Sequence, residues 1–270
     1  MLRERLTTIL VLLPILLGII AAGGWIYAAA IVVVLGLAAA EFGMLFHHLD
    51  RRPSIPILAG GAGLFAVLRG LHGFSSSHWA IVLVVLLAML WHLIDYERGA
   101  SGAGSDFAIT LSGTLYVGWI GSYLISLRAL PDGLWWLLTA LPAMWLADSA
   151  AFFVGKRIGR HRLAPRLSPN KTWEGYLAGV LAGAVSGLLF VLLWRIGAGE
   201  GSSLSAMRGL LMGFVLSVLA PLGDLTVSMI KREAGAKDSG NLLPGHGGAL
   251  DRIDTWIWSG VFGFYIISLL

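Results

Sequence analysis

Long apolar runs separated by short polar segments make up most of this sequence of 270 residues. A helix needs about 20 apolar residues to cross the hydrocarbon core of a bilayer, and tilted or re-entrant helices vary around that length. Nine runs come near it, at roughly 6–22, 25–45, 55–71, 79–95, 107–127, 134–154, 173–195, 206–228 and 255–269. The pattern predicts an all-α, polytopic integral membrane protein with about nine transmembrane helices and polar loops on the cytoplasmic side.

The first two apolar runs leave two arrangements open. Only Gly23 and Gly24 join the runs, and Pro14 and Glu41 interrupt their apolar character. The runs form either two complete spans or a hairpin that does not fully cross the membrane.

Basic residues are concentrated on one side of the predicted spans. If Arg3 and Arg5 are cytoplasmic, alternation of the spans places most Lys and Arg residues on the inner side. The inner residues are 15 of the 19, namely Arg3, Arg5, Arg51, Arg52, Arg98, Lys156, Arg157, Arg160, Arg162, Arg166, Lys171, Lys231, Arg232, Lys237 and Arg252. The positive-inside rule therefore predicts that the N-terminus and both large polar loops, 155–172 and 229–254, are cytoplasmic.

The overall composition agrees with a membrane protein and removes several classes of function. Hydrophobic residues make up 57% of the chain and charged residues only 13%, about half the charged fraction of a soluble domain. The absence of cysteine excludes disulfides, thiolate metal sites and cysteine nucleophiles. Inner-side basic residues and contact with anionic lipids explain the net charge of +4, so we expect the lipid bilayer as a partner and no nucleic acid.

The polar segment 228–254 is where we expect the chemistry. It carries charges of both signs and a histidine among glycines, namely Lys231, Arg232, Lys237, Arg252, Glu233, Asp238, Asp251, Asp254 and His246. Carboxylates hold Mg2+, cations hold phosphate oxygens, and glycines let backbone N–H groups come close to a ligand. The segment therefore suits a metal-bound polyphosphate. The alternative is a solvated loop whose charges anchor the protein at the membrane surface.

Two acidic residues lie inside predicted spans. Asp148 and Asp224 precede the cytoplasmic ends of their helices by about 9 and 6 Å at the rise of an α-helix. An acid in a membrane is costly unless it faces a cavity or a partner, so each is a candidate functional residue. The alternative is a structural acid paired with a neighbouring Lys or Arg. Asp251 approaches the same layer from a third element, and three such carboxylates would suit one Mg2+ or two metals.

The sequence SPNKTWEG at 168–175 predicts the start of a helix. Ser168 would be the N-cap and Pro169 the first helical residue, which leaves N–H groups that favour an anion. Lys171 would add a positive charge for phosphate, and Glu174 would orient Lys171 or reach a metal. An ordinary capped transmembrane helix explains Ser168 and Pro169 but not Lys171 and Glu174.

Three stretches in the second half of the chain resemble the phosphatidate cytidylyltransferases, also called CDP-diacylglycerol synthases. The longest runs through Ser228, Lys231, Arg232, Lys237, Asp238, Leu243, Pro244, His246, Gly247, Gly248, Asp251, Arg252 and Asp254. The second is SPNKTWEG, and the third is Asp148 followed by Phe152 and Gly155. Ala249 departs from the family pattern, which usually has a larger aliphatic residue there, and the difference concerns packing rather than a ligand.

The resemblance implies a membrane nucleotidyltransferase that makes CDP-diacylglycerol and pyrophosphate from CTP and phosphatidic acid, by direct in-line attack of the lipid phosphate on the CTP α-phosphate. It implies Mg2+, with a second metal or a monovalent cation left open, and a homodimer in the bacterial inner membrane with a cytoplasmic active site. The catalytic residues implied are Asp224, Asp251, Lys237 and His246, and the Mg2+ ligands are Asp148, Asp224 and Asp251. The substrate-binding residues are Ser168, Asn170, Lys171, Thr172, Glu174, Lys231, Arg232, Asp238, Gly247, Gly248 and Arg252.

A glycine- and serine-rich segment at 96–106 is the expected break between an N-terminal accessory half, 1–105, and a catalytic half, 106–270. Two other functions stay open: a related transferase that uses CTP with another lipid or a polyprenol, and a transporter with a phosphate or cation site. A transporter usually places its charges near the bilayer midplane in two matching halves. Here the charges gather at one face, and no internal repeat is evident.

Overall fold

The computed structural model describes residues 2–219, 221–240, 242 and 247–270, and the side chains of this part apart from residues 2–9 and 11. Helices make up most of it, and the sheet found among these residues has two strands, β1 and β2. The predicted all-α class is confirmed. The chain forms two compact units, each described here by itself: Met1–Ser126 with Ile230–Ile257, and Leu127–Met229 with Trp258–Leu270.

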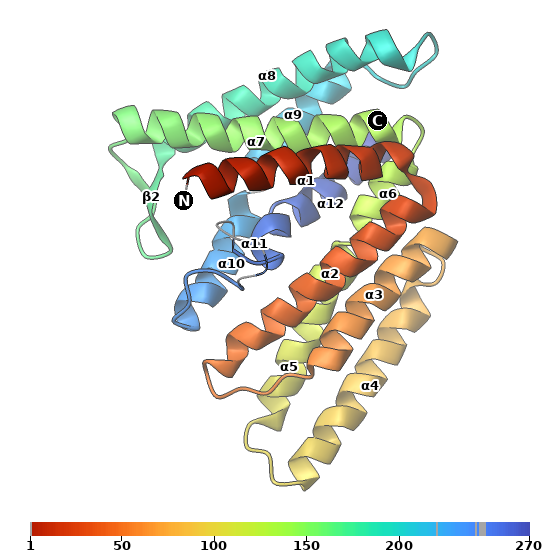
Figure 1. Ribbon diagram of the computed structural model, residues 1–270, viewed down its shortest axis with the longest axis vertical. Helices are drawn as coiled ribbons and strands as arrows, with labels where there is room; N and C mark the ends of the chain where they lie inside the picture. Colours follow the sequence, from red (N-terminus) through yellow and green to blue (C-terminus); the bar gives the residue numbers. More distant parts are fainter. Residues whose placement is uncertain (1, 220, 241, 243–246) are drawn as a thin grey trace. The chain divides into compact units, whose positions relative to one another are not determined.

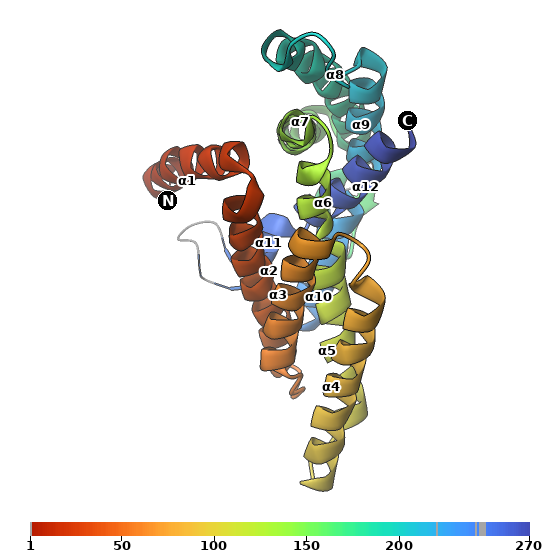
Figure 2. The same ribbon diagram turned by 90° about the vertical axis from the view of Figure 1, so that its right-hand side faces the viewer.

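The first unit is a bundle of apolar helices. Its elements are α1 (Leu2–Ala22), α2 (Gly24–His47), α3 (Ile55–His72), α4 (Ser77–Glu97), α5 (Ala103–Gly113), the π-helical η1 (Thr114–Ile120) and the short α11 (Leu250–Ile253). Helices α2, α3 and α4 run side by side (Figures 1 and 2). A Cβ added to Gly118 would lie 2.5 Å from Ala62 Cα, so a small residue is needed where η1 packs on α3.

The second unit is built on long helices that pack through glycines. Its elements are α7 (Gly133–Ile158), β1 (Arg162–Ala164), β2 (Ser168–Thr172), α8 (Trp173–Ala198) and α9 (Ala206–Leu219). The helices α6 (Tyr123–Ala129), α10 (Pro221–Glu233) and α12 (Trp256–Leu269) contribute residues to both units. Helix α8 packs on both α7 and α9 (Figure 1). A Cβ on Gly209 would lie 2.6 Å from the Gly187 carbonyl oxygen, so larger residues would separate α8 from α9.

The predicted count of nine transmembrane helices is not confirmed. Within the described residues, seven helical stretches are long and apolar enough to cross a membrane, namely Gly24–His47, Ile55–His72, Ser77–Glu97, Ala103–Ala129, Gly133–Ile158, Trp173–Ala198 and Ala206–Glu233. The run predicted at 255–269 forms α12, whose 14 residues extend about 21 Å, less than the about 30 Å of a hydrocarbon core. In α1 the described apolar stretch is only Leu12–Ala22. Among the described residues, the runs predicted at 6–22 and 255–269 are the two that fall outside this set of seven.

The expected boundary near residue 105 stays a prediction about function. Helix α5 begins at Ala103, directly after the glycine-rich break. The first compact unit, however, continues to Ser126 and includes Ile230–Ile257. Most of the polar segment 228–254 thus lies in the same compact unit as the N-terminal helices.

Candidate functional site

The helix predicted from SPNKTWEG starts later than expected. Residues 168–172 form the extended strand β2, which pairs antiparallel with β1. The prediction of Ser168 as N-cap and Pro169 as first helical residue is therefore wrong, because proline also suits the extended backbone of an edge strand. Thr172 is the N-cap of α8, and its hydroxyl oxygen accepts a hydrogen bond from Gly175 N at 3.2 Å.

Glu174, in the first turn of α8, holds the turn that precedes the hairpin of β1 and β2. Its carboxylate accepts hydrogen bonds from the backbone N–H groups of Arg160 at 3.1 Å and His161 at 3.3 Å. Its Oε1 also lies 2.6 Å from His161 Nδ1. The turn that precedes β1 is thereby fixed to the start of α8, and this fixes the strand that carries Lys171.

Lys171 and Asp224 form an ion pair between β2 and α10 in the second unit. Lys171 Nζ donates to Asp224 Oδ2, and each side chain is 32% exposed. The run predicted over 206–228 corresponds to α9 and the start of α10, on either side of residue 220, which lies outside the described residues. Asp224 lies in the first turn of α10 as the structure describes it. Lys171, which the sequence predicted to bind phosphate, and Asp224, which it predicted to bind a metal, are therefore direct neighbours.

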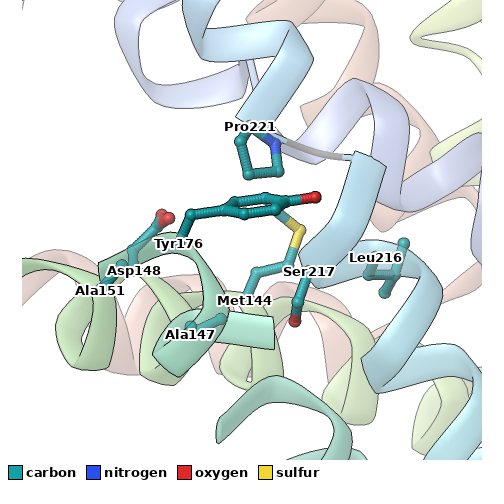
Figure 3. A pocket seen from close by; sticks show the side chains of 9 residues that line it. Met144, Ala147, Asp148, Ala151, Tyr176, Leu216, Ser217 and Pro221 are labelled. Atoms are coloured by element: carbon teal, nitrogen blue, oxygen red, sulfur yellow. The ribbon is translucent and has the colours of Figure 1, made fainter. Parts of the chain in front are cut away.

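Asp148, on α7, belongs to the same cluster. It interacts electrostatically with both Lys171 and Asp224, so the structure brings these three predicted site residues together. Asp148 also lines a pocket of about 20 Å³, room for about one water molecule. Figure 3 shows its carboxylate beside the ring of Tyr176, which lies across the pocket. Tyr176 Oη donates to the Val218 carbonyl at 3.1 Å, and this bond fixes the ring on α9.

Lys231 and Asp251 form a second ion pair, in the first unit. Lys231 Nζ lies 2.5 Å from Asp251 Oδ1, and the side chains are only 12% and 6% exposed. Asp251 Oδ2 accepts hydrogen bonds from Ser239 N at 2.7 Å, Ser239 Oγ at 3.0 Å and Gly248 N at 3.1 Å. Burial alone would raise the pKa of Asp251, but the Lys231 ammonium and two backbone N–H groups outweigh it, so the pKa lies below its ordinary value. Asp251 is therefore held as a carboxylate.

The two glycines predicted to bind substrate surround Asp251. Gly247 has φ +79°, in the left-handed region, and a Cβ there would lie 2.6 Å from Asp251 Oδ2. The Gly248 N–H points at the same carboxylate oxygen. In this structure the glycines thus let the backbone approach an acid. His246 lies outside the described residues, and its role stays a prediction.

Several other predicted site residues are exposed at the surface of their units. They are Asn170, Arg232, Lys237, Asp238 and Arg252. Exposed cations of this kind attract a soluble anion such as a nucleotide. Ser168 is half-buried in β2, and Thr172 is buried by its capping role.

The sequence that carries these residues is similar to the sequences of known proteins. A model of the cytidylyltransferase family matches residues 3–270, almost the whole chain. The chain belongs to the cytidylyltransferase family. This confirms the family resemblance inferred from the three stretches, and it confirms the prediction that the protein is an enzyme.

Three relatives of this cytidylyltransferase share the same name, phosphatidate cytidylyltransferase. That of Bacillus subtilis (strain 168) is 39% identical over 198 residues, which cover 73% of this chain and 70% of the relative. That of Pseudomonas aeruginosa PAO1 is 37% identical over 264 residues, or 94% and 93% of the two chains. That of Synechocystis sp. PCC 6803 is 29% identical over 298 residues, or 99% and 97%. The similarity therefore extends over both compact units.

The carboxylates of this cytidylyltransferase can be compared with the needs of Mg2+. Among the residues that the structure describes, no three acidic or histidine side chains gather closely enough to hold a metal by themselves. Mg2+ is commonly held by one or two carboxylates while substrate phosphates and waters complete its coordination. Asp148 and Asp224 supply two carboxylates within one unit, and this fits a Mg2+ ion that binds together with a polyphosphate. Asp251 belongs to the other unit, where its oxygens already accept hydrogen bonds.

Two residues beside Asp251 were not assigned to the cytidylyltransferase site from the sequence. Ser239 carries no local signal that distinguishes it from any other loop serine. Glu41 counted only as an interruption of an apolar run, although an acid in such a run is itself a sign of a buried polar partner. Both contact the loop that holds Asp251.

Proposed function

We propose that this cytidylyltransferase makes CDP-diacylglycerol and pyrophosphate from CTP and phosphatidic acid. The names of its relatives support both substrates. The structural observation that carries the proposal is the pairing of Lys171 with Asp224 and of Lys231 with Asp251. Helix α10 has Asp224 in its first turn and Lys231 in its last, so one helix contributes to both pairs. We propose that the residues of both pairs take part in the reaction.

The proposed reaction needs no covalent enzyme intermediate. An oxygen of the phosphatidic acid phosphate is itself the nucleophile, and it forms a bond to the α-phosphorus of CTP. The bond from that phosphorus to the oxygen of the β-phosphate breaks, and this oxygen keeps the electron pair as pyrophosphate leaves. The protein must offset the repulsion between two anions and hold them in line.

Positively charged side chains offset the repulsion between the two phosphate-bearing substrates of the proposed reaction. A lysine held by a carboxylate keeps its ammonium group in one place, so less side-chain entropy is lost when a phosphate oxygen arrives. Lys171 is exposed enough to reach a phosphate from the edge of β2. The exposed Arg232, Lys237 and Arg252 add to the positive charge of the polar segment. Mg2+, when bound, would neutralise phosphate charge, and Asp148 and Asp224 are the carboxylates of one unit that would hold it, whereas a part for Asp251 in binding Mg2+ stays a prediction from the sequence.

The stereochemistry at the α-phosphorus tests direct attack. We expect a single diastereomer of CTP with sulfur on the α-phosphorus to give CDP-diacylglycerol of inverted configuration, because one in-line displacement inverts the phosphorus. Phosphorus NMR of the thiolated product reads the configuration. Retention would require two displacements and would contradict direct attack.

Competition between acceptors separates the proposal from its two rivals. Purified protein in mixed micelles is given CTP labelled at the α-phosphate, with phosphatidic acid and a polyprenyl phosphate at equal concentration. Label in CDP-diacylglycerol supports the proposal, whereas preferential label on the polyprenol would show that the polyprenyl phosphate, and not phosphatidic acid, is the substrate. Uptake of phosphate or cation into vesicles without CTP turnover would favour a transporter.

We propose that the protein lies in the cytoplasmic membrane of a bacterium with loops 155–172 and 229–254 on the cytoplasmic side. Two of the seven apolar stretches separate these loops, so a count of seven leaves them on the same side. Single-cysteine variants of this cysteine-free chain provide the test. We expect an impermeant thiol reagent on intact cells to label Glu200→Cys but not Ser101→Cys, both of which replace exposed residues. The opposite pattern would invert the topology.

A homodimer, which the family resemblance also implies, is part of the proposal. Light scattering of the protein in detergent, corrected for bound detergent, should give twice the mass of one 28.8 kDa chain. A mass of one chain in bilayer nanodiscs that retain turnover would contradict the dimer.

A further inference from the structure

Glu41 is a buried carboxylate in an otherwise apolar helix of the first unit. It lies near the end of α2 and is only 9% exposed. A carboxylate in such a place is costly unless hydrogen bonds satisfy its oxygens. Glu41 Oε2 accepts a hydrogen bond from Ser239 Oγ at 2.8 Å and another from the backbone N–H of Leu250 at 2.9 Å. Both of these partners come from the polar segment about 200 residues later.

The polar segment is shaped to enclose the Glu41 carboxylate. A Cβ added to Gly240 would lie 2.6 Å from Glu41 Oε1. A Cβ added to Gly248 would collide with Glu41 Oε2 and with the hydroxyl oxygen of Ser239. A side chain at either glycine would displace the Glu41 carboxylate from these contacts, so the fit between α2 and the segment is close.

Ser239 connects Glu41 to Asp251. Its hydroxyl oxygen lies 2.8 Å from Glu41 Oε2 and 3.0 Å from Asp251 Oδ2, and its backbone N–H donates to Asp251 Oδ2 at 2.7 Å. The hydroxyl has one hydrogen, so it donates to one of the two carboxylates at a time. A displacement of Ser239 would therefore disturb two of the contacts that hold Asp251 beside Lys231.

We propose that Glu41 is a positioning residue for the cytidylyl transfer. It fixes Ser239 and Leu250 against α2, and these two residues hold Asp251 in the orientation that pairs it with Lys231. The N-terminal helices then contribute directly to the geometry of the proposed site, through a carboxylate that touches no substrate. The kinetic part of this inference rests on the proposed function, whereas the structural part does not.

Hydrogen exchange followed by mass spectrometry tests the structural part without any assay of activity. In Glu41→Gln, peptides that cover 239–250 should exchange about 10- to 100-fold faster, the factor expected when charge-assisted hydrogen bonds are lost. Peptides from α3 and α4 should keep their protection. Ser239→Ala should act in the same direction with a smaller effect, and it serves as the second variant if Glu41→Gln does not fold.

A matched control separates positioning from general loss of stability. Thr110, at 0% exposed, lies in the same unit and contacts Ser54 N at 3.0 Å and His92 Nε2 at 2.9 Å. Thr110→Val should lower thermal stability, yet leave exchange in 239–250 and turnover per folded molecule unchanged. Unchanged exchange in 239–250 for both Glu41→Gln and Ser239→Ala would overturn the proposal, as would equally fast exchange in Thr110→Val.

Kinetics then test the link to function. Glu41→Gln should lower kcat for CDP-diacylglycerol formation about 10- to 100-fold with little change in KM for CTP, because a displaced Asp251 acts on the transition state more than on ground-state binding. Faster exchange with a normal kcat would overturn the positioning role. If the wild-type protein shows no cytidylyl transfer at all, the proposed function fails, and the exchange experiment still decides whether Glu41 holds the segment.

Discussion

Asp224→Asn and Asp251→Asn are each expected to remove nearly all cytidylyl transfer from a protein that still folds. Asparagine keeps the size of aspartate and most of its hydrogen bonding but loses the negative charge that would hold Mg2+. Any remaining turnover should need more Mg2+. CTP turnover per folded molecule, measured with thermal stability in detergent, reads both effects.

The structure predicts different stability effects for these two variants. The pair of Asp224 and Lys171 is 32% exposed on both sides, so its loss should cost at most about 1 kcal/mol. The pair of Asp251 and Lys231 is nearly buried, and removal of one buried partner typically costs about 3–5 kcal/mol. Inactivity of Asp224→Asn at near-normal stability would therefore support a role in metal binding most clearly.

Asp132→Asn is the matched control for Asp224→Asn. Asp132 Oδ2 accepts a hydrogen bond from Ser203 N at 2.6 Å in the second unit, and Asp132 is not part of the predicted site. Its substitution should change stability without changing turnover per folded molecule. If Asp224→Asn behaves in the same way, destabilised yet active, the assignment of Asp224 to a metal is wrong and the acid is structural.

Lys171→Ala and Lys237→Ala are each expected to lower kcat by about 100-fold, the usual scale for the loss of one group that stabilises transition-state charge. Binding of phosphatidic acid should weaken much less, because the interaction grows as charge develops during transfer. Initial rates at saturating CTP, together with lipid binding measured separately, distinguish the two effects.

Lys156→Ala provides the comparison for both lysine variants. Lys156 is exposed near the end of α7, with its ammonium group 5.9 Å from the centre of the Phe152 ring, and it has no assigned role in the site. It should keep near-normal kcat. Near-normal rates in Lys171→Ala and Lys237→Ala would show that neither lysine stabilises the transition state of the transfer.

Local sequence signals located the elements of the site better than they located the contacts. The apolar run at 173–195 predicted the first residue of α8, Trp173, whereas SPNKTWEG taken alone placed the helix start too early. The backbone of 168–172 is extended because it pairs with β1, and strand pairing between short segments leaves little trace in the pattern of apolar positions. Propensity for a cap at Ser168 was overruled by this tertiary pairing.

The sequence did not predict which distant residues pair with one another, for a similar reason. Lys171 and Asp224 were each assigned to the site, but their ion pair joins residues 53 positions apart, and either could have paired with another charge. Glu41 and Ser239 are 198 positions apart, and an isolated acid in an apolar run does not identify its partner. Charge type and membrane depth are local properties, whereas the choice of partner depends on how the helices pack.

The direct test of the central claim is transfer of label from [α-32P]CTP to phosphatidic acid by the purified protein, with and without Mg2+. Wild-type protein should produce chloroform-extractable label that co-migrates with CDP-diacylglycerol, only with Mg2+ present, and Asp132→Asn should do the same. Asp224→Asn should produce almost none. Lipid-linked label that is equally strong in Asp224→Asn, or no lipid-linked label from folded wild-type protein with Mg2+, would contradict the account.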